Sequence, residues 1–219
     1  MQPWAMAPSK HSSSPGIRLY CEIGPTRIYH GDCREAVDQF EGTVISDPPY
    51  GINYVHRCFR TTKFAGMRII GDDKPFDPRP WLRYRQVLLW GAGHYASRLP
   101  EGGRWLVWDK RSGNVNAMSC VEIAWAKGTG GRADRIFHHL WDGFRKASEK
   151  GVPRVHPTQK PIALMEWCIG FYKRPGLIID PYMGSGTTLV AATRLGLASV
   201  GIDIDERNCE IAAKRLQAG

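Results

Sequence analysis

Several features that define common protein classes are missing from this sequence. Its 219 residues contain no apolar run near the ~18 residues that a membrane-spanning helix needs, and no internal repeat. The six cysteines are far apart, with no Cys-x-x-Cys pair and no His/Cys cluster of metal-ligand spacing. We therefore expect a globular protein without a metal, with reduced cysteines, in the cytoplasm.

The first sixteen residues lack the apolar segment of a signal peptide and are rich in Ser and Pro. We expect residues 1–16 to form a flexible tail. The remaining residues, 17–219, fit a single domain of ordinary size, because 42% of the chain is hydrophobic and 23% is charged.

Acidic residues are scarce in two segments, which together account for the net charge of +9. Residues 51–70 contain four Lys/Arg and no acid, and residues 127–160 contain eight Lys/Arg against three acids. Aromatic residues are interleaved with these charges, as on surfaces that meet a polyanion. A solvated basic face would give the same pattern, so charge alone does not decide between the two.

Apolar strand-like segments alternate with helix-like ones along the chain. Strands are expected at 27–30, 43–46, 104–108, 120–126, 177–180 and 199–202. Helices are expected at 33–40, in the first part of 81–97, at 162–172, at 187–195 and after Asp205. This alternation predicts an α/β fold with an open, mainly parallel sheet and helices on both faces.

One stretch with chemical character, Ser-Asp-Pro-Pro-Tyr-Gly at 46–51, follows the apolar run at 43–45. The two prolines cannot donate backbone hydrogen bonds and hold the chain extended. Such a stretch is either a stiff turn or an active site with a carboxylate and an aromatic ring at the end of a strand.

A second such stretch is the glycine-rich turn at 180–188, Asp-Pro-Tyr-Met-Gly-Ser-Gly-Thr-Thr, between a strand and a helix. Glycines there let a ligand approach the backbone, and Asp203 follows Gly184 at the interval where a carboxylate binds ribose hydroxyls. No Lys follows Gly186, which excludes a phosphate loop, and the third glycine of a dinucleotide site is missing. Asp180 would repel a pyrophosphate but suits a ligand with an ammonium group.

Three motifs in this order, Asp-Pro-Pro-Tyr at 47–50, His-Pro-Thr-Gln-Lys-Pro at 156–161 and the glycine turn at 180–188, closely resemble one family. This is the β group of the bacterial and phage DNA amino-methyltransferases that use S-adenosylmethionine, and the similarity spans about residues 27–217. The resemblance implies a Rossmann-like methyltransferase fold with a seven-stranded, mostly parallel sheet. The motif order indicates a circularly permuted version of it.

The resemblance also implies the roles of individual residues. Asp180 would hold the ammonium of the methionine part, Asp203 the ribose and Asp32 the adenine of the cofactor. The expected cofactor-binding residues are Asp32, Thr158, Lys160, Asp180, Gly184, Ser185, Gly186, Thr187 and Asp203. The expected catalytic residues are Asp47, Pro48, Pro49 and Tyr50.

The implied enzyme moves a methyl group from S-adenosylmethionine to the exocyclic amine of a flipped base in double-stranded DNA. Related cytosine-N4 enzymes often carry Ser in the position of Asp47, so N6 of adenine is expected and cytosine N4 is the alternative. An RNA or protein-amide methyltransferase is a more distant alternative. A nicotinamide dehydrogenase is disfavoured by the glycine pattern, and a DNA-binding remnant by the intact motifs.

Short DNA-recognition insertions are expected near 51–80 and 127–155. The residues expected to contact DNA are Arg57, Arg60, Lys63, Arg132, Arg135, Arg145 and Lys146. The resemblance places the enzyme in the cytoplasm of a bacterial or phage-infected cell. It leaves open a homodimer and a restriction endonuclease partner.

Overall fold

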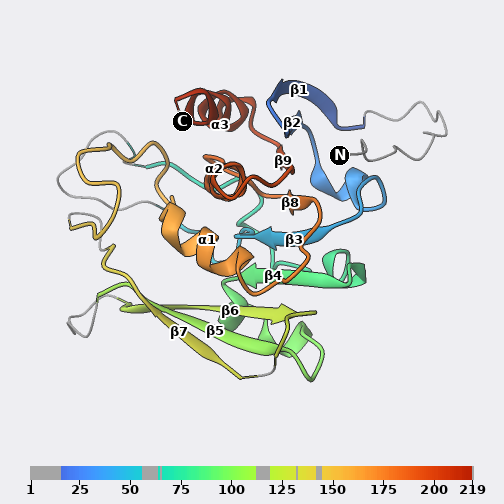
Figure 1. Cartoon of the computed structure of the whole chain (residues 1–219), viewed down its shortest axis with the longest axis vertical. Coiled ribbons are helices and arrows are strands. Elements are labelled where there is room, and N and C mark those ends of the chain that lie inside the picture. Colours follow the sequence, from blue (N-terminus) through green and yellow to red (C-terminus); the bar gives the residue numbers. More distant parts are fainter. Residues whose placement is uncertain are drawn as a thin grey trace.

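The structure is a computed structural model of the chain, and it describes residues 16–55, 64, 66–111, 119–131, 133–141 and 145–218. In this part nine strands form one sheet in the order β1-β2-β9-β8-β3-β4-β6-β5-β7 (Figure 1). The strands are β1 (Arg18–Ile23), β2 (Thr26–His30), β3 (Thr43–Ser46), β4 (Gln86–Trp90), β5 (Arg104–Asp109), β6 (Val121–Lys127), β7 (Arg135–His138), β8 (Ile178–Asp180) and β9 (Ser199–Asp203).

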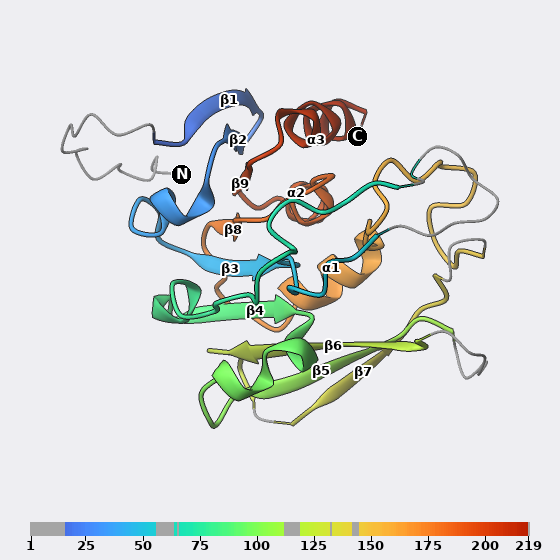
Figure 2. The same cartoon turned by 180° about the vertical axis from the view of Figure 1, so that it is seen from behind.

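The strand directions decide which loops meet. Strands β2, β9, β8, β3 and β4 pair in parallel, and β5 points the same way because β6 is antiparallel to both β4 and β5. The carboxyl ends of these strands therefore lie at one edge of the sheet, together with the amino end of β6. In Figure 1 this edge is on the left, and in Figure 2 it is on the right.

The mostly parallel sheet is confirmed, but it has nine strands where seven were expected. The two extra strands lie at the two edges of the sheet. Strand β1 folds back on β2 as an antiparallel hairpin, and β7 pairs in parallel with β5. Neither segment has the continuous apolar run of a central strand, so the sequence pattern did not indicate them.

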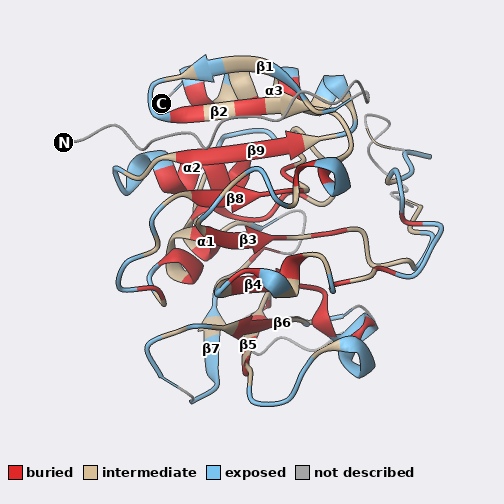
Figure 3. Ribbon diagram, turned by 90° about the vertical axis from the view of Figure 1, so that its right-hand side faces the viewer, coloured by how far each residue is buried: buried red, intermediate tan, exposed pale blue. Residues whose placement is uncertain are grey.

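Three α-helices pack against one face of the sheet. They are α1 (Ile162–Ile169), α2 (Thr187–Arg194) and α3 (Glu206–Gln217), and their buried residues share a core with alternate residues of the strands. The opposite face is covered by short 3-10 segments, including η1 (Cys33–Ala36) and η3 (Trp81–Arg83). Figure 3 shows the central strands buried between these two layers.

The helix expected in the first part of 81–97 was wrong. Before β4, only Trp81–Arg83 is helical, as a 3-10 turn, and Gln86–Trp90 is the central strand β4. An apolar run that is buried on both faces has no periodicity that separates strand from helix, and Val87–Trp90 is such a run. The helix expected at 33–40 is likewise shortened to η1.

Three further properties concern only the residues described above. None of their helices combines the length and the apolar character needed to cross a membrane. Their cysteines, Cys21, Cys33, Cys120, Cys168 and Cys209, carry free thiols, and Cys58 lies outside the described residues. Among the same residues no group of three or more His, Cys, Asp or Glu side chains is arranged to hold a metal ion.

Candidate active site

Four aspartates that the sequence singled out lie at the carboxyl edge of the sheet. Asp47 follows β3, Asp180 ends β8, Asp203 ends β9, and Asp32 stands two residues after β2. These strands are neighbours and parallel, so their ends converge. In open α/β sheets, ligands bind outside the carboxyl ends of the strands, which makes this edge the candidate active site.

Asp47 is hydrogen-bonded through both carboxylate oxygens. The Tyr50 hydroxyl donates to Oδ1 at 2.5 Å, and the Lys160 ammonium donates to Oδ2. Burial raises the pKa of Asp47, and the ammonium of Lys160 opposes this shift. Burial also raises the pKa of Tyr50 well above its usual value, so its hydroxyl stays protonated and remains a donor.

The ring of Tyr50 is fixed by two residues that the sequence did not indicate. Gly91 follows β4, and a Cβ atom at this position would stand 1.9 Å from Cε1 of Tyr50. The imidazole of His94 stacks on the Tyr50 ring with centroids 5.0 Å apart and planes at 15°. His94 itself is exposed to solvent. Its imidazole covers the face of the Tyr50 ring, which would otherwise be open to a planar ligand.

The chain after the Asp-Pro-Pro-Tyr motif is held by Asp72, a residue that no sequence motif indicates. Its buried carboxylate accepts from the backbone N–H groups of Gly51 at 2.8 Å, Ile52 at 3.4 Å and Tyr54 at 2.5 Å. Three donors on one carboxylate fix the loop that follows Tyr50. Of the prolines between Asp47 and Tyr50, Pro48 is buried and Pro49 is half-buried.

Lys160 is expected to bind the cofactor, and the structure places its ammonium at Asp47. The same ammonium lies 2.9 Å from Oε2 of Glu122, on β6. Glu122 was not expected at the site, because β6 reaches this edge only through its antiparallel pairing with β4 and β5. The sequence gives no local signal for a contact of this kind.

Asp180 is almost completely buried at the end of β8. Its Oδ1 accepts from the Ser46 hydroxyl at 2.6 Å and from the Tyr182 backbone N–H at 3.2 Å. Burial raises the pKa of Asp180 to about 6, and these hydrogen bonds oppose the shift. Ser46 directly precedes Asp47, so one hydrogen bond joins the strand end of the first motif to that of the glycine turn.

The segment 156–161 lies over the glycine turn. A Cβ atom on Gly184 would have His156 Cε1, 3.9 Å away, as its nearest neighbour, so there is room beside this backbone. Burial lowers the pKa of His156 to about 4, with Arg154 and Lys160 adding to the effect, and the imidazole is neutral at pH 7. Thr158 hydrogen-bonds His156 Nδ1 through its hydroxyl at 3.1 Å.

Three residues of the turn contact helix α3. Arg215 donates through Nη1 to the carbonyl oxygen of Ser185 at 2.7 Å, to its hydroxyl at 3.1 Å and to the hydroxyl of Thr187 at 2.9 Å. Gly186 has φ +74°, and a Cβ there would stand 2.7 Å from Cβ of Ala212. Ser185, Gly186 and Thr187 are expected to bind the cofactor, and in this structure they also anchor the turn to α3.

Gly184 has space beside its backbone and Gly186 does not, so replacing each glycine by alanine should change stability by a different amount. Gly186→Ala is expected to lower the free energy of unfolding by about 2–4 kcal/mol, because it adds a clash with Ala212 to the strain of a positive φ. Gly184→Ala meets no close atom, so only backbone strain of about 1 kcal/mol applies. Urea denaturation of the two variants measures the difference, and equal losses would contradict this assignment.

Asp203 closes the glycine turn through the backbone. Its Oδ2 accepts from the Gly184 N–H at 2.9 Å, and its Oδ1 accepts from the Asp205 N–H at 2.8 Å and from Asn208 at 3.1 Å. Burial raises its pKa to about 6 against these hydrogen bonds. Each carboxylate oxygen has two acceptor positions, so Oδ2 keeps one for a ligand hydroxyl.

Asp32 lies beside this group, because His30 of β2 pairs with Asp203. Its carboxylate caps η1 by accepting from the Arg34 backbone N–H at 2.9 Å, and it also binds the Arg34 side chain. Hydrogen bonding to Arg34 lowers the pKa of Asp32, so it is ionised at pH 7. A cofactor amine would share this carboxylate with the exposed Arg34.

The residues expected to contact DNA are only partly described. Arg57, Arg60, Lys63 and Arg132 lie outside the described residues. Arg135 is the first residue of β7. Because β7 is parallel to β5, this residue lies at the opposite edge of the sheet from the candidate active site. Arg145 and Lys146 follow the other end of β7, where the Lys146 ammonium lies 4.8 Å from the centre of the Trp141 ring.

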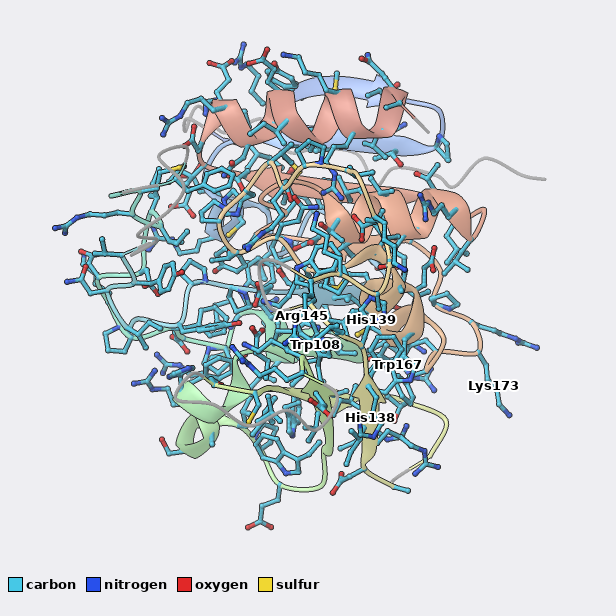
Figure 4. The ribbon with its side chains drawn as sticks, turned by 90° about the vertical axis from the view of Figure 1, so that its left-hand side faces the viewer. Trp108, His138, His139, Arg145, Trp167 and Lys173 are labelled. Atoms are coloured by element: carbon cyan, nitrogen blue, oxygen red, sulfur yellow. The ribbon has the colours of Figure 1, made fainter. Side chains whose placement is uncertain are left out.

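Aromatic side chains accompany these charges. Phe137 stacks on His139 at 5.4 Å between centroids, and it contacts Trp167 of α1 at 5.1 Å. Figure 4 looks onto this side of the molecule and labels Arg145, Trp108 and His139 at its centre, with Lys173 extending away from the fold. Trp108 donates through Nε1 to the carbonyl oxygen of His139 at 2.9 Å.

The fold and the site define a class: a Rossmann-like α/β protein with a glycine turn for a nucleotide-type ligand and a second carboxylate site beside it. A family model described as DNA methylase (N6_N4_Mtase) matches residues 105–214. The chain belongs to this DNA methylase family.

Two curated relatives share part of the chain. A type II methyltransferase of Lactococcus lactis subsp. cremoris, M2.LlaDCHI, is 45% identical over 82 residues. Another of Streptococcus pneumoniae, M2.DpnII, is 46% identical over 81 residues. Each match covers 36% of this chain and 30% of the relative, so this chain matches less than a third of the length of these relatives.

Solved structures share the fold over most of the chain. The M1.HpyAVI complex with S-adenosylmethionine has a TM-score of 0.51 and 24% identity, covering 87% of this chain and 99% of that one. TTHA0409 of Thermus thermophilus, complexed with S-adenosyl-L-methionine, has a TM-score of 0.55 and 18% identity, covering 88% and 93%. The cytosine-N4-specific PvuII DNA methyltransferase has a TM-score of 0.53 and 13% identity, covering 89% and 93%.

Proposed function

We propose that this protein is a site-specific DNA methyltransferase that uses S-adenosylmethionine and methylates an exocyclic amine, N6 of adenine. The observation that carries the proposal is the hydrogen bond from Ser46 to Asp180, 2.6 Å long and fully buried. It joins the end of the strand that delivers Asp47 to the end of the strand that begins the glycine turn. Two chemically distinct sites therefore adjoin, as a transfer reaction between two bound molecules requires.

The residues of the glycine turn fit S-adenosylmethionine. The ionised Asp180 pairs with an ammonium, Asp203 keeps an acceptor position for a ribose hydroxyl, and Gly184 leaves room beside the backbone. The neutral imidazole of His156 lies over this space without adding a positive charge that would repel the ligand. When bound, S-adenosylmethionine supplies an electrophilic methyl group on a sulfonium.

Asp47 and Tyr50 prepare the nucleophile. The lone pair of a base amine is delocalised into the ring, so the amine attacks poorly until its hydrogens are bound. If Asp47 and the carbonyl of Pro48 accept the two hydrogens, the nitrogen becomes more tetrahedral and its lone pair can point at the methyl group. The base leaves the duplex to reach this edge and replaces His94 on the ring of Tyr50.

The hydrogen bond of Ser46 also bears on which base is methylated. Ser46 is completely buried and donates its hydroxyl proton to Asp180, so it is not placed to bind a target amine. Asp47 is then the residue before Pro-Pro-Tyr that faces the substrate. Because related cytosine-N4 enzymes often carry Ser in that position, this arrangement supports adenine N6.

Double-stranded DNA is the proposed partner. The segment after β7 brings Arg145 and Lys146 together with aromatic side chains, and phosphate contacts from such segments position DNA without reading its sequence. Both curated relatives carry the designation type II methyltransferase, which is consistent with the expected restriction endonuclease partner.

Methyl transfer from labelled S-adenosylmethionine to DNA, RNA and protein tests the proposal. We expect label in DNA alone. After digestion of the DNA to nucleosides, the label should be in N6-methyl-2′-deoxyadenosine. Label in N4-methylcytosine would overturn the choice of base. Label in RNA or protein and none in DNA would overturn the proposed substrate.

Cofactor affinity should depend on pH through Asp180. Its pKa of about 6 means that the carboxyl group is mostly ionised at pH 7 and mostly protonated at pH 5. Only the ionised form pairs with the ammonium of the ligand. The Kd for S-adenosylhomocysteine is therefore expected to rise about tenfold as the pH falls from 7 to 5. Calorimetric titration measures it, and Asp180→Asn should flatten the profile. An unchanged profile in Asp180→Asn would assign the pH dependence to another group.

A further inference from the structure

A row of four charged side chains crosses the site, and its signs alternate; one of them, Lys160, is buried and the other three are half-buried. Lys110 Nζ lies 3.0 Å from Glu122 Oε1, and Lys160 Nζ lies 2.9 Å from Glu122 Oε2. The same Lys160 ammonium contacts Asp47. The four residues come from the ends of β5 and β3, from β6 and from the segment before α1, so the row forms only in the folded protein.

Lys160 is the most enclosed member, with 6% of its surface exposed. Burial would lower the pKa of Lys160, but the carboxylates of Asp47 and Glu122 raise it above its usual value. Although burial opposes it, the ammonium groups of Lys160 and Lys110 lower the pKa of Glu122 to about 2. Lys160 and Glu122 are therefore both charged at neutral pH, and each of these two charges has an opposite neighbour.

We propose that Lys160 and Glu122 are positioning residues for Asp47. The Lys160 ammonium favours the ionised form of the catalytic carboxylate in this half-buried site, and Glu122 holds the ammonium so that Asp47 does not bind it alone. This inference rests on the proposed function, because it assigns to Asp47 the task of accepting a hydrogen from the target amine.

Counting acceptor positions shows why the ammonium must be shared. Tyr50 uses one position on Oδ1 of Asp47 and Lys160 uses one on Oδ2, which leaves a second position on each oxygen for the target amine. The ammonium has three hydrogens, and its neighbours are Asp47, Glu122 and the Tyr50 oxygen at 3.4 Å. Without Glu122, Asp47 would be the only carboxylate of the described part of the chain in contact with Lys160, and it would hold the ammonium more tightly.

The charged and titratable groups that face Asp47 come from every element packed around it. Besides Lys160 and Glu122 they are Tyr50, Tyr95 and Asp180. Burial raises the pKa of both tyrosines, so neither carries charge at neutral pH. Asp180 is negative above about pH 6 and is present in every variant described below. The direction in which the pKa of Asp47 shifts therefore depends on the charge of the residue that is replaced.

The two residues should shift the titration of Asp47 in opposite directions. Lys160→Met removes a positive charge beside the carboxylate, so the pKa of Asp47 should rise by more than one unit. Glu122→Gln keeps the shape of the side chain and removes a negative charge, so the pKa should fall. If Lys160 and Glu122 had a purely structural role, both substitutions would lower stability, but they would not shift the pKa of Asp47 in opposite directions.

Carbon-13 NMR of the Asp47 carboxyl group, assigned with Asp47→Asn, measures this titration in the full-length protein without DNA. The acidic limb of the kcat–pH profile for methyl transfer should move in the same directions, and Lys160→Arg should restore the wild-type limb. Glu210→Gln and Lys214→Met, which break an exposed ion pair on α3, are matched controls that should shift neither readout.

Shifts of the same sign, or none, in Lys160→Met and Glu122→Gln would overturn the proposal. If Lys160→Met does not fold, the pKa of Asp47 in Glu122→Gln decides the question alone. A pKa that does not fall in this variant would contradict the proposal that Glu122 shares the Lys160 ammonium. If the wild-type protein transfers no methyl group to DNA, the proposed function fails. The NMR titration then still decides whether Lys160 and Glu122 control the charge of Asp47.

Discussion

Asp47→Ala is expected to lower kcat for methyl transfer to DNA by about 100- to 1,000-fold. The alanine cannot accept a hydrogen from the target amine, so the lone pair of that amine stays delocalised in the base. Removing one preorganised partner of the reacting group from a buried site has effects of this size. Lys160 keeps Glu122 as its partner in the variant, which limits the damage to the fold.

The control for this substitution is Asp38→Ala. Asp38 is exposed and pairs with Arg83 on the surface, so its loss should leave kcat and the melting temperature nearly unchanged. Binding of S-adenosylhomocysteine should stay within a few fold of the wild-type value in Asp47→Ala, because Asp180 and the glycine turn are intact. A variant that still methylates DNA at the wild-type rate would exclude Asp47 as the acceptor for the amine.

Gly91→Ala is the second substitution with a large expected effect. The new methyl group would occupy the position of the Tyr50 ring, 1.9 Å from Cε1, so the ring must move. Its hydroxyl then leaves Asp47, and the face that stacks on the base is displaced. A displacement of about 1 Å in a reacting arrangement can lower the rate by about 100-fold, which is the loss expected in kcat.

Gly93→Ala provides a close control for this effect. Gly93 is two residues further along, and a Cβ atom there meets nothing within 4 Å. This variant should keep its activity, whereas Gly91→Ala should resemble Tyr50→Ala in kcat and in the stacking of a 2-aminopurine target measured by fluorescence. Equal activity of the two glycine variants would show that the position of the Tyr50 ring does not limit the reaction.

The sequence predicted the location of the site because strand ends carry its main residues. Asp47, Asp180 and Asp203 each follow or end a buried apolar strand, and parallel strands bring their carboxyl ends to one edge. This inference needs only the strands and their directions. It therefore succeeded although the helix expected in the first part of 81–97 proved to be strand β4.

The contacts that tune the site could not be predicted in the same way. Lys160 contacts Asp47 across 113 positions of the chain, and Glu122 reaches Lys160 from an antiparallel strand. The neighbours of the glycine turn show the same limit. The motif predicts a ligand at Ser185 and Thr187, but it does not predict that Arg215 of α3 donates to both of their hydroxyls. Such partners depend on tertiary packing, which local patterns do not encode.

The most direct test of the central claim is expression of the wild-type chain in a host without DNA methylation, followed by sequencing that maps modified bases. The account predicts N6-methyladenine in a single short sequence context, and its absence from cells that express Asp47→Ala. DNA without any modified base in the presence of the folded wild-type protein would contradict the claim. Persistent methylation by Asp47→Ala would contradict the mechanism.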